Sequence, residues 1–141
     1  MKKPFSLYIH IPFCISKCSY CDFFSIKCGI SNLTTYLIPD SYITSLINEL
    51  KFRIKNYKSK ECKSVYIGGG TPSLLTQNQF TSIFDFIKNK LELTKDYEFT
   101  VELNPDDVTE ELLQFLNASI INRISLGIQS LDDSVLKFVK R

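Results

Sequence analysis

Three cysteines, Cys14, Cys18 and Cys21, stand within eight residues of the stretch YIHIPFCISKCSYCDFFS. A disulfide framework needs an even number of cysteines, and a closed zinc site needs four ligands. An iron–sulfur cube presents four irons, normally one to each cysteine thiolate. Three thiolates on one short loop would therefore hold three irons and leave the fourth open, as catalytic metal sites do.

Other interpretations of these thiols remain open. Cys18 and Cys21 alone could be half of a zinc knuckle, but only single Cys28 and Cys62 follow, and the one histidine, His10, precedes them. A thioredoxin-type pair normally opens a helix, and SYCDFF shows no helical pattern. The sequence favours a three-cysteine cluster over zinc or buried free thiols. Cys28 and Cys62 are interpreted as small buried residues, and His10 is assigned no role.

The elements that must position these cysteines alternate between short β-rich runs and helical patterns, four times over. Strands are expected at 6–13, 64–69, 97–104 and 121–129. The second run is continuously apolar, which predicts a strand buried on both faces. The first helix is expected at about 40–56, and the second from a Thr76–Gln79 capping box to Leu91. A third is expected from Thr109 to Leu116, and a fourth after a cap at Ser130 and Asp133.

Repeated βα units predict an α/β fold with parallel strands and right-handed crossovers. Either an open doubly wound sheet or part of a βα barrel fits this pattern. Residues 1–141 show no linker and are expected to form one domain. Because a full barrel needs about 250 residues, a barrel would be present only as its N-terminal half. We expect the chain to be truncated within the fourth helix, with the fourth strand at the sheet edge.

Composition narrows the class of protein. The chain is 44% hydrophobic with a formal net charge of +2, which is typical of a globular domain. The basic residues at 51–60 lie where a helix should end, which indicates a solvated helix end rather than a nucleic-acid site. The N-terminus lacks a cleavage site for a signal peptide, and no run reaches the ~18 apolar residues of a membrane span. A cytoplasmic protein is expected, in which cysteines serve metal or redox chemistry.

The cysteine spacing C-x3-C-x2-C, with Tyr20 before the last cysteine, resembles the radical S-adenosylmethionine (SAM) superfamily. The ordered motifs YIHIPFC, GGGTPSLL, VELNP and RISLGIQS resemble the oxygen-independent coproporphyrinogen III oxidase family and its heme-chaperone relatives. This resemblance runs from Tyr8 to Arg141. It implies the N-terminal half, about four βα units, of a partial TIM-type βα barrel.

The resemblance also implies cofactors and site residues. Cys14, Cys18 and Cys21 would hold a [4Fe–4S] cluster whose open iron is chelated by SAM, and an electron donor would drive formation of a radical that abstracts hydrogen from substrate. The implied SAM contacts are Tyr8, Tyr20, Gly69, Gly70, Thr71, Glu102, Gln129 and Arg141. No catalytic residue is assigned.

The glycines and Glu102 can also be interpreted from the residues alone. Glycines after the second strand let a ligand approach the backbone, although a tight turn explains them equally well. A carboxylate at Glu102, in an apolar setting, is expected to face a polar partner, unless it is a half-exposed residue at a strand end.

The residues after the cluster motif distinguish two branches of the resembled family. The oxidase carries a further cysteine directly after the motif, whereas here Asp22 and Phe23 follow Cys21. The CDF ending resembles the heme-chaperone branch, which implies heme, a porphyrinogen or apo-hemoproteins as partners. The charge pattern, taken separately, predicts no nucleic-acid partner. The alternatives are a true coproporphyrinogen III oxidase, an inactive fragment and a zinc-binding module. The family's heme and substrate segments would lie beyond Arg141, so the 141-residue chain alone is expected to be inactive.

Overall fold

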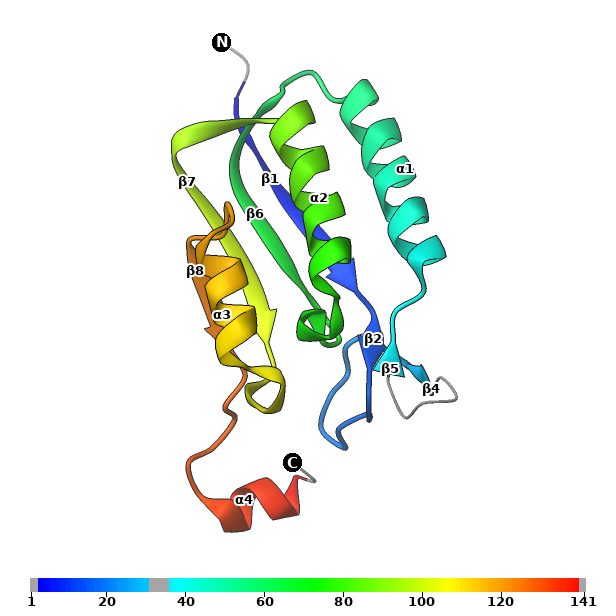
Figure 1. Cartoon of the computed structure of the whole chain (residues 1–141), viewed down its shortest axis with the longest axis vertical. Helices are drawn as coiled ribbons and strands as arrows, with labels where there is room; N and C mark the ends of the chain where they lie inside the picture. The colour runs from blue at the N-terminus through cyan, green and yellow to red at the C-terminus, as the bar shows by residue number, and fades with distance from the viewer. Residues whose placement is uncertain (1–2, 31–35, 140–141) are drawn as a thin grey trace.

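The computed structural model describes residues 3–30 and 36–139, and it is built on a four-stranded parallel sheet (Figure 1). Its order is β1-β6-β7-β8, and its strands are β1 (Phe5–Ile11), β6 (Glu61–Gly69), β7 (Glu92–Leu103) and β8 (Arg123–Leu126). Each neighbouring pair is parallel. The predicted α/β class is therefore confirmed, and β8 lies at one edge of the sheet, as expected.

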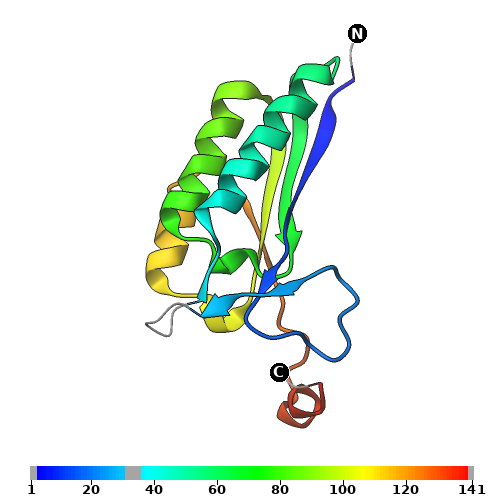
Figure 2. The same cartoon turned by 90° about the vertical axis from the view of Figure 1, so that its right-hand side faces the viewer.

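Three helices, α1 (Asp40–Asn56), α2 (Gln77–Lys90) and α3 (Glu110–Asn117), cover one face of this sheet (Figure 2). The predicted bounds of α1 are confirmed. The predicted capping box of α2 is also present, since Thr76 Oγ1 accepts from the Gln79 amide and the Gln79 side chain accepts from the Thr76 amide. These two bonds satisfy N–H groups that the first helical turn leaves without partners.

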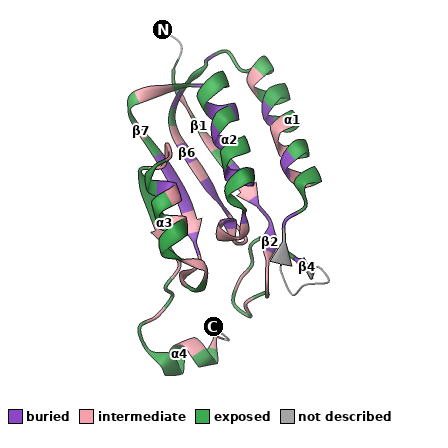
Figure 3. Ribbon diagram, in the orientation of Figure 1, coloured by how far each residue is buried: buried purple, intermediate pink, exposed green. Residues whose placement is uncertain are grey.

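The core lies between the helices and the facing side of the sheet (Figure 3). The buried residues of α2 repeat at helical spacing, as expected from the sequence, and meet alternate residues of β6 and β7. Central members of this core are Phe80, Ile83, Ile87, Val65, Ile67, Phe99 and Val101. Leu91 is buried but caps α2 instead of extending it. Cys28 and Cys62 are 4% and 0% exposed, which confirms that both are small core residues.

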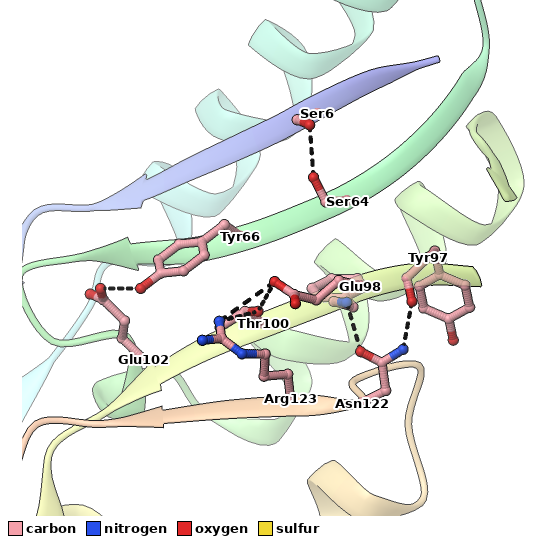
Figure 4. Close-up of polar contacts among 10 residues, drawn as sticks. Ser6, Ser64, Tyr66, Tyr97, Glu98, Thr100, Glu102, Asn122 and Arg123 are labelled. Atoms are coloured by element: carbon pink, nitrogen blue, oxygen red, sulfur yellow. Dashed lines mark hydrogen bonds and ion pairs between the residues drawn. The ribbon is translucent and has the colours of Figure 1, made fainter.

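The opposite side of the sheet, called here the open face, is polar (Figure 4). The prediction that the second strand is buried on both faces is wrong, because Ser64 and Tyr66 are only half-buried. No helix among the described residues covers this side, and the strands accordingly alternate between apolar and polar residues. The open face is formed by Ser6, Tyr8, His10, Ser64, Tyr66, Glu98, Thr100, Glu102, Arg123 and Ser125.

Short elements gather at the carboxyl ends of the strands. Two parallel two-residue strands, β2 (Phe13–Cys14) and β3 (Ile26–Lys27), pair with each other, and so do the antiparallel strands β4 (Gly29–Ile30) and β5 (Tyr36–Leu37). Single 3-10 turns, η1 (Pro72–Leu74) and η2 (Pro105–Asp107), follow β6 and β7. None of these was predicted as a separate element, and the first predicted strand, at 6–13, is divided at Pro12 into β1 and β2.

The last helix, α4 (Asp133–Phe138), stands apart from the sheet below the strand ends (Figures 1 and 2). Its N-cap is Asp132, whose carboxylate accepts from the Ser134 amide at 2.7 Å. The predicted cap at Ser130 and Asp133 is therefore wrong. Ser130 instead accepts from the Asp132 amide and forms the turn that leads into the helix. Among the described helices, none is long and apolar enough to cross a membrane.

Candidate functional site

A cavity of about 550 Å³ opens at the carboxyl ends of the strands, where parallel α/β folds bind their ligands. Four segments line it: the cysteine loop (residues 14–25), the glycine turn after β6 (residues 69–72), the end of β7 with η2 (residues 102–107), and the end of β8 (residues 125–129). Its size falls within the range of about 300–1,000 Å³ that is usual for small-molecule sites.

The cysteine loop carries all three thiols of the motif into this cavity. Its base is closed where β2 meets β3, by bonds from the Ile26 amide to the Pro12 carbonyl at 2.7 Å and from the Cys28 amide to the Cys14 carbonyl at 2.9 Å. Cys14, Cys18 and Cys21 are each half-buried and line the cavity. The structure thus places the three predicted cluster ligands on the wall of one cavity.

The glycine turn lies directly against the start of the cysteine loop. Gly69 has a φ of +121°, which a residue with a Cβ rarely adopts. At Gly70 a Cβ would stand 2.6 Å from the Phe13 carbonyl oxygen and 2.8 Å from Cys14 Sγ. Glycine is therefore required here by the close approach of the turn to the thiol, in addition to the turn itself. Gly69, Gly70 and Thr71 all line the cavity.

Glu102 is held at the end of β7 by two donors from β6. Its carboxylate accepts from the Tyr66 hydroxyl at 2.6 Å and from the Gly69 amide at 3.1 Å, which confirms the expected polar partner. The bond to Glu102 raises the pKa of Tyr66, and desolvation adds to the effect. Tyr66 was missed in the sequence, although its place on the open face, diagonal to Glu102 on the neighbouring strand, follows from strand alternation.

Two further predicted SAM contacts line the same cavity. Tyr20 reaches it from the cysteine loop and is 45% exposed. Gln129 reaches it from the end of β8, and its φ of 67° makes it the non-glycine residue with positive φ in the described parts of the chain. Such a backbone conformation is unusual for glutamine and often marks a functional position.

One predicted contact among the described residues, Tyr8, does not line the cavity. Tyr8 lies on the open face beside it, with its ring centroid 6.0 Å from that of Tyr66 and its hydroxyl 3.0 Å from His10 Nδ1. Desolvation raises the pKa of Tyr8, and the nearby charge of Glu102 adds to this effect. Arg141 lies outside the described residues. The roles of Tyr8 and Arg141 stay predictions.

A single metal ion and an iron–sulfur cluster require different arrangements of the three thiols. Within residues 3–30 and 36–139, no group of three or more His, Cys, Asp or Glu side chains is gathered around one ion position. A cluster does not require such convergence, because each thiolate binds a different iron. The zinc alternative gains no support from this arrangement.

Comparison with known proteins agrees with this geometry. Residues 8–141 match the family model for the radical SAM superfamily. The chain is 40% identical over 141 residues to the heme chaperone HemW of Lactococcus lactis and 38% identical over 138 residues to that of Escherichia coli. A solved structure of coproporphyrinogen III oxidase (HemN) from E. coli, described as a radical SAM enzyme, superposes with a TM-score of 0.84 at 28% identity.

The chain belongs to the radical SAM superfamily, whose members in general use SAM and a [4Fe–4S] cluster. Within this superfamily it is similar to bacterial heme chaperones. The match covers 100% of this chain but 35% of the Lactococcus relative, and 99% of this chain but 31% of the E. coli oxidase. The chain thus spans about a third of the length of these proteins.

Proposed function

We propose that the chain holds a [4Fe–4S] cluster through Cys14, Cys18 and Cys21 and binds SAM in the adjoining cavity, as the radical SAM core of a heme chaperone. The single observation that carries this proposal is the convergence of three cysteines, a glycine turn and Glu102 on one cavity. The free, half-buried thiols of such a loop need reducing surroundings, so we propose the cytoplasm as its location.

Each segment would contribute a different part of SAM binding. The thiols would leave one iron open for SAM, and the close contact of Gly70 with Cys14 would place the ligand beside the cluster. Glu102, aligned by Tyr66 and Gly69, would accept from the ammonium group of SAM. Gln129 would lie beside the ribose. When bound and reduced, the cluster would supply the electron that cleaves the sulfonium bond of SAM.

The charges around the cavity suit this ligand. Three carboxylates, those of Glu102, Asp106 and Asp107, line it together with one ammonium group, that of Lys17. SAM carries a sulfonium, an ammonium and a carboxylate group, and so has a net positive charge. A wall with more acidic than basic groups attracts such a ligand and orients its two cations.

The heme-chaperone assignment rests on the residues after Cys21 and on the relatives. Asp22 and Phe23 stand where the resembled oxidase carries a further cysteine, and the similar curated proteins are named heme chaperones. An oxidase of coproporphyrinogen III is the second candidate, favoured by the likeness to the E. coli structure.

An anaerobic assay of the full protein separates the two candidates. The reconstituted protein is given coproporphyrinogen III, SAM and a reductant, and separately heme followed by an apo-hemoprotein. A chaperone is expected to transfer heme and leave coproporphyrinogen unchanged. Decarboxylation of coproporphyrinogen, without heme binding, would contradict the chaperone assignment and support the oxidase.

A further inference from the structure

We infer that His10 is a positioning residue that fastens the end of the cysteine loop to β1. Its side chain lies on the open face near the carboxyl end of β1, where His10 pairs in register with Gly68. His10 Nε2 is 2.9 Å from the carbonyl oxygen of Phe24, three residues beyond the last cysteine of the motif. One imidazole therefore joins the first strand directly to the distal end of the loop.

The partners of the imidazole define its tautomer. A backbone carbonyl can only accept a hydrogen bond, so Nε2 carries the proton that is donated to Phe24. In the neutral ring Nδ1 is then an acceptor, and the Tyr8 hydroxyl, 3.0 Å away, donates to it. The two bonds thus fix the imidazole at both nitrogens. They also turn the hydroxyl proton of Tyr8 toward His10 and leave the lone pairs of its oxygen for a donor from elsewhere.

The ring also rests on the glycine turn. A Cβ at Gly69 would stand 2.7 Å from His10 Nδ1 and 2.8 Å from Cε1, so the imidazole occupies the space that glycine leaves. His10 therefore contacts three parts of the candidate site at once: Tyr8 on β1, Gly69 in the turn and Phe24 at the end of the loop. A side chain that only filled space could make the contact with Gly69 but neither hydrogen bond.

The hydrogen bond from His10 to Phe24 closes the cysteine loop at a second point, in addition to its base. The pairing of β2 with β3 closes its base, through the bonds of the Ile26 and Cys28 amides. The bond from His10 to Phe24 lies just before this pair and would resist its opening. A rigid loop matters because three thiolates must bind three irons at the same time. The functional role of the bond from His10 to Phe24 therefore rests on the proposed cluster site.

Amide hydrogen exchange in the metal-free full chain tests the fastening without any bound cofactor. The reporters are the amides of Ile26 and Cys28, whose bonds break when the loop opens, and amides of α2 serve as the reference for global unfolding. Three substitutions separate the two bonds of His10. Glutamine places an amide donor near the Nε2 position, asparagine places an acceptor near the Nδ1 position, and leucine offers neither.

His10→Asn and His10→Leu are expected to speed exchange at Ile26 and Cys28 about five- to tenfold, the effect of one lost hydrogen bond. His10→Gln should stay within about twofold of the parent because it keeps the donor to Phe24. Exchange in α2 should not change in any of them. Reconstituted His10→Asn should also lose iron faster on gel filtration than His10→Gln.

Two results would overturn the inference. Unchanged exchange at Ile26 and Cys28 in both His10→Asn and His10→Leu would show that the bond to Phe24 does not hold the loop. Equal acceleration in all three variants, shared by α2, would identify His10 as a packing residue of the fold. Either result is independent of whether the cysteines take up iron, so failure of this inference is distinguishable from failure of the proposed function.

Discussion

The carboxylate of Glu102 accepts from the backbone amide of Gly69 at 3.1 Å, which links the end of β7 to the glycine turn that follows β6. The other carboxylate oxygen accepts from the Tyr66 hydroxyl. Both oxygens are thus aligned by fixed donors, and each keeps a lone pair for a further donor. A carboxylate fixed in this way at the wall of a cavity is prepared to bind a cation.

Glu102→Gln is expected to weaken SAM binding. The glutamine amide can accept from Gly69 and donate to Tyr66, so the fold is retained, but the negative charge that would face an ammonium group is lost. Hydrogen bonds to charged groups contribute about 1.5–3 kcal/mol, which corresponds to a loss in affinity of roughly ten- to hundredfold. Isothermal titration of the reconstituted protein with SAM measures the change.

Glu98→Gln is the matched control for this substitution. Glu98 lies on the same strand and on the same open face, but its carboxylate bonds Thr100 and Arg123 and does not line the cavity. The SAM affinity of Glu98→Gln should stay within about twofold of that of the parent, because Glu98 does not line the cavity. Its exposed ion pair with Arg123 contributes little to the stability of the fold. Equal losses in Glu98→Gln and Glu102→Gln would contradict a direct role of Glu102.

Substitution of the motif cysteines tests the cluster ligands. Serine at Cys14, Cys18 or Cys21 removes one thiolate from three, and each variant should retain less than half the iron of the reconstituted parent, as measured by iron and sulfide analysis. Cys28→Ala is the control. Burial raises the pKa of the Cys28 thiol, and the charge of Cys14 adds to this effect, so Cys28 stays protonated and is a poor ligand. Iron loss in Cys28→Ala equal to that in Cys18→Ser would contradict the assigned ligand set.

Gly70→Ala tests the contact between the glycine turn and the cluster loop. The added Cβ would meet the Phe13 carbonyl oxygen at 2.6 Å and Cys14 Sγ at 2.8 Å. A backbone atom cannot yield cheaply, so the loop must shift, at a cost of about 1–3 kcal/mol in the free energy of unfolding. Denaturant unfolding and iron analysis should both show a loss. Thr71→Ala, one residue further on, should leave iron content unchanged, and a normal cluster in Gly70→Ala would mean that the two segments do not touch.

Tyr66→Phe should change the stability of the fold at alkaline pH. The pKa of Tyr66 is raised above its ordinary value of 10.0, chiefly by its bond to Glu102, so the folded state holds the phenol proton more tightly than the unfolded chain does. The stability that this bond contributes is complete below about pH 10 and is lost as the pH rises through the raised pKa. The free energy of unfolding, measured with urea between pH 8 and 11, should therefore fall less steeply with pH in Tyr66→Phe than in the parent. Parallel curves would contradict the bond.

Much of the fold follows from local signals in the sequence. The apolar stripe that includes Ile43 and Leu50 predicted α1 correctly, and the Thr76–Gln79 pair predicted the start of α2. The two-residue strands β2 and β3 could not be predicted, because their pairing depends on the closure of the loop between them and not on an apolar period. The polar open face was missed for a similar reason, since Tyr66 and its aliphatic neighbours resemble a continuous apolar run.

The candidate site was also predicted only in part. Cysteine spacing and motif order indicated the residues that line the cavity. Sequence reasoning did not reveal which groups hold them in place. Tyr66 meets Glu102 through pairing between strands, and His10 meets the carbonyl of Phe24 across the loop. Such contacts depend on register and backbone position, which residue types alone do not define.

The most direct test of the account is electron paramagnetic resonance of the full protein, reconstituted anaerobically with iron and sulfide, reduced, and compared with and without SAM. The site described here predicts a [4Fe–4S] signal that changes when SAM is added, because one iron is left open to that ligand. A protein that assembles no cluster, or a cluster signal that SAM leaves unchanged, would contradict the assignment of Cys14, Cys18 and Cys21 as a radical SAM site.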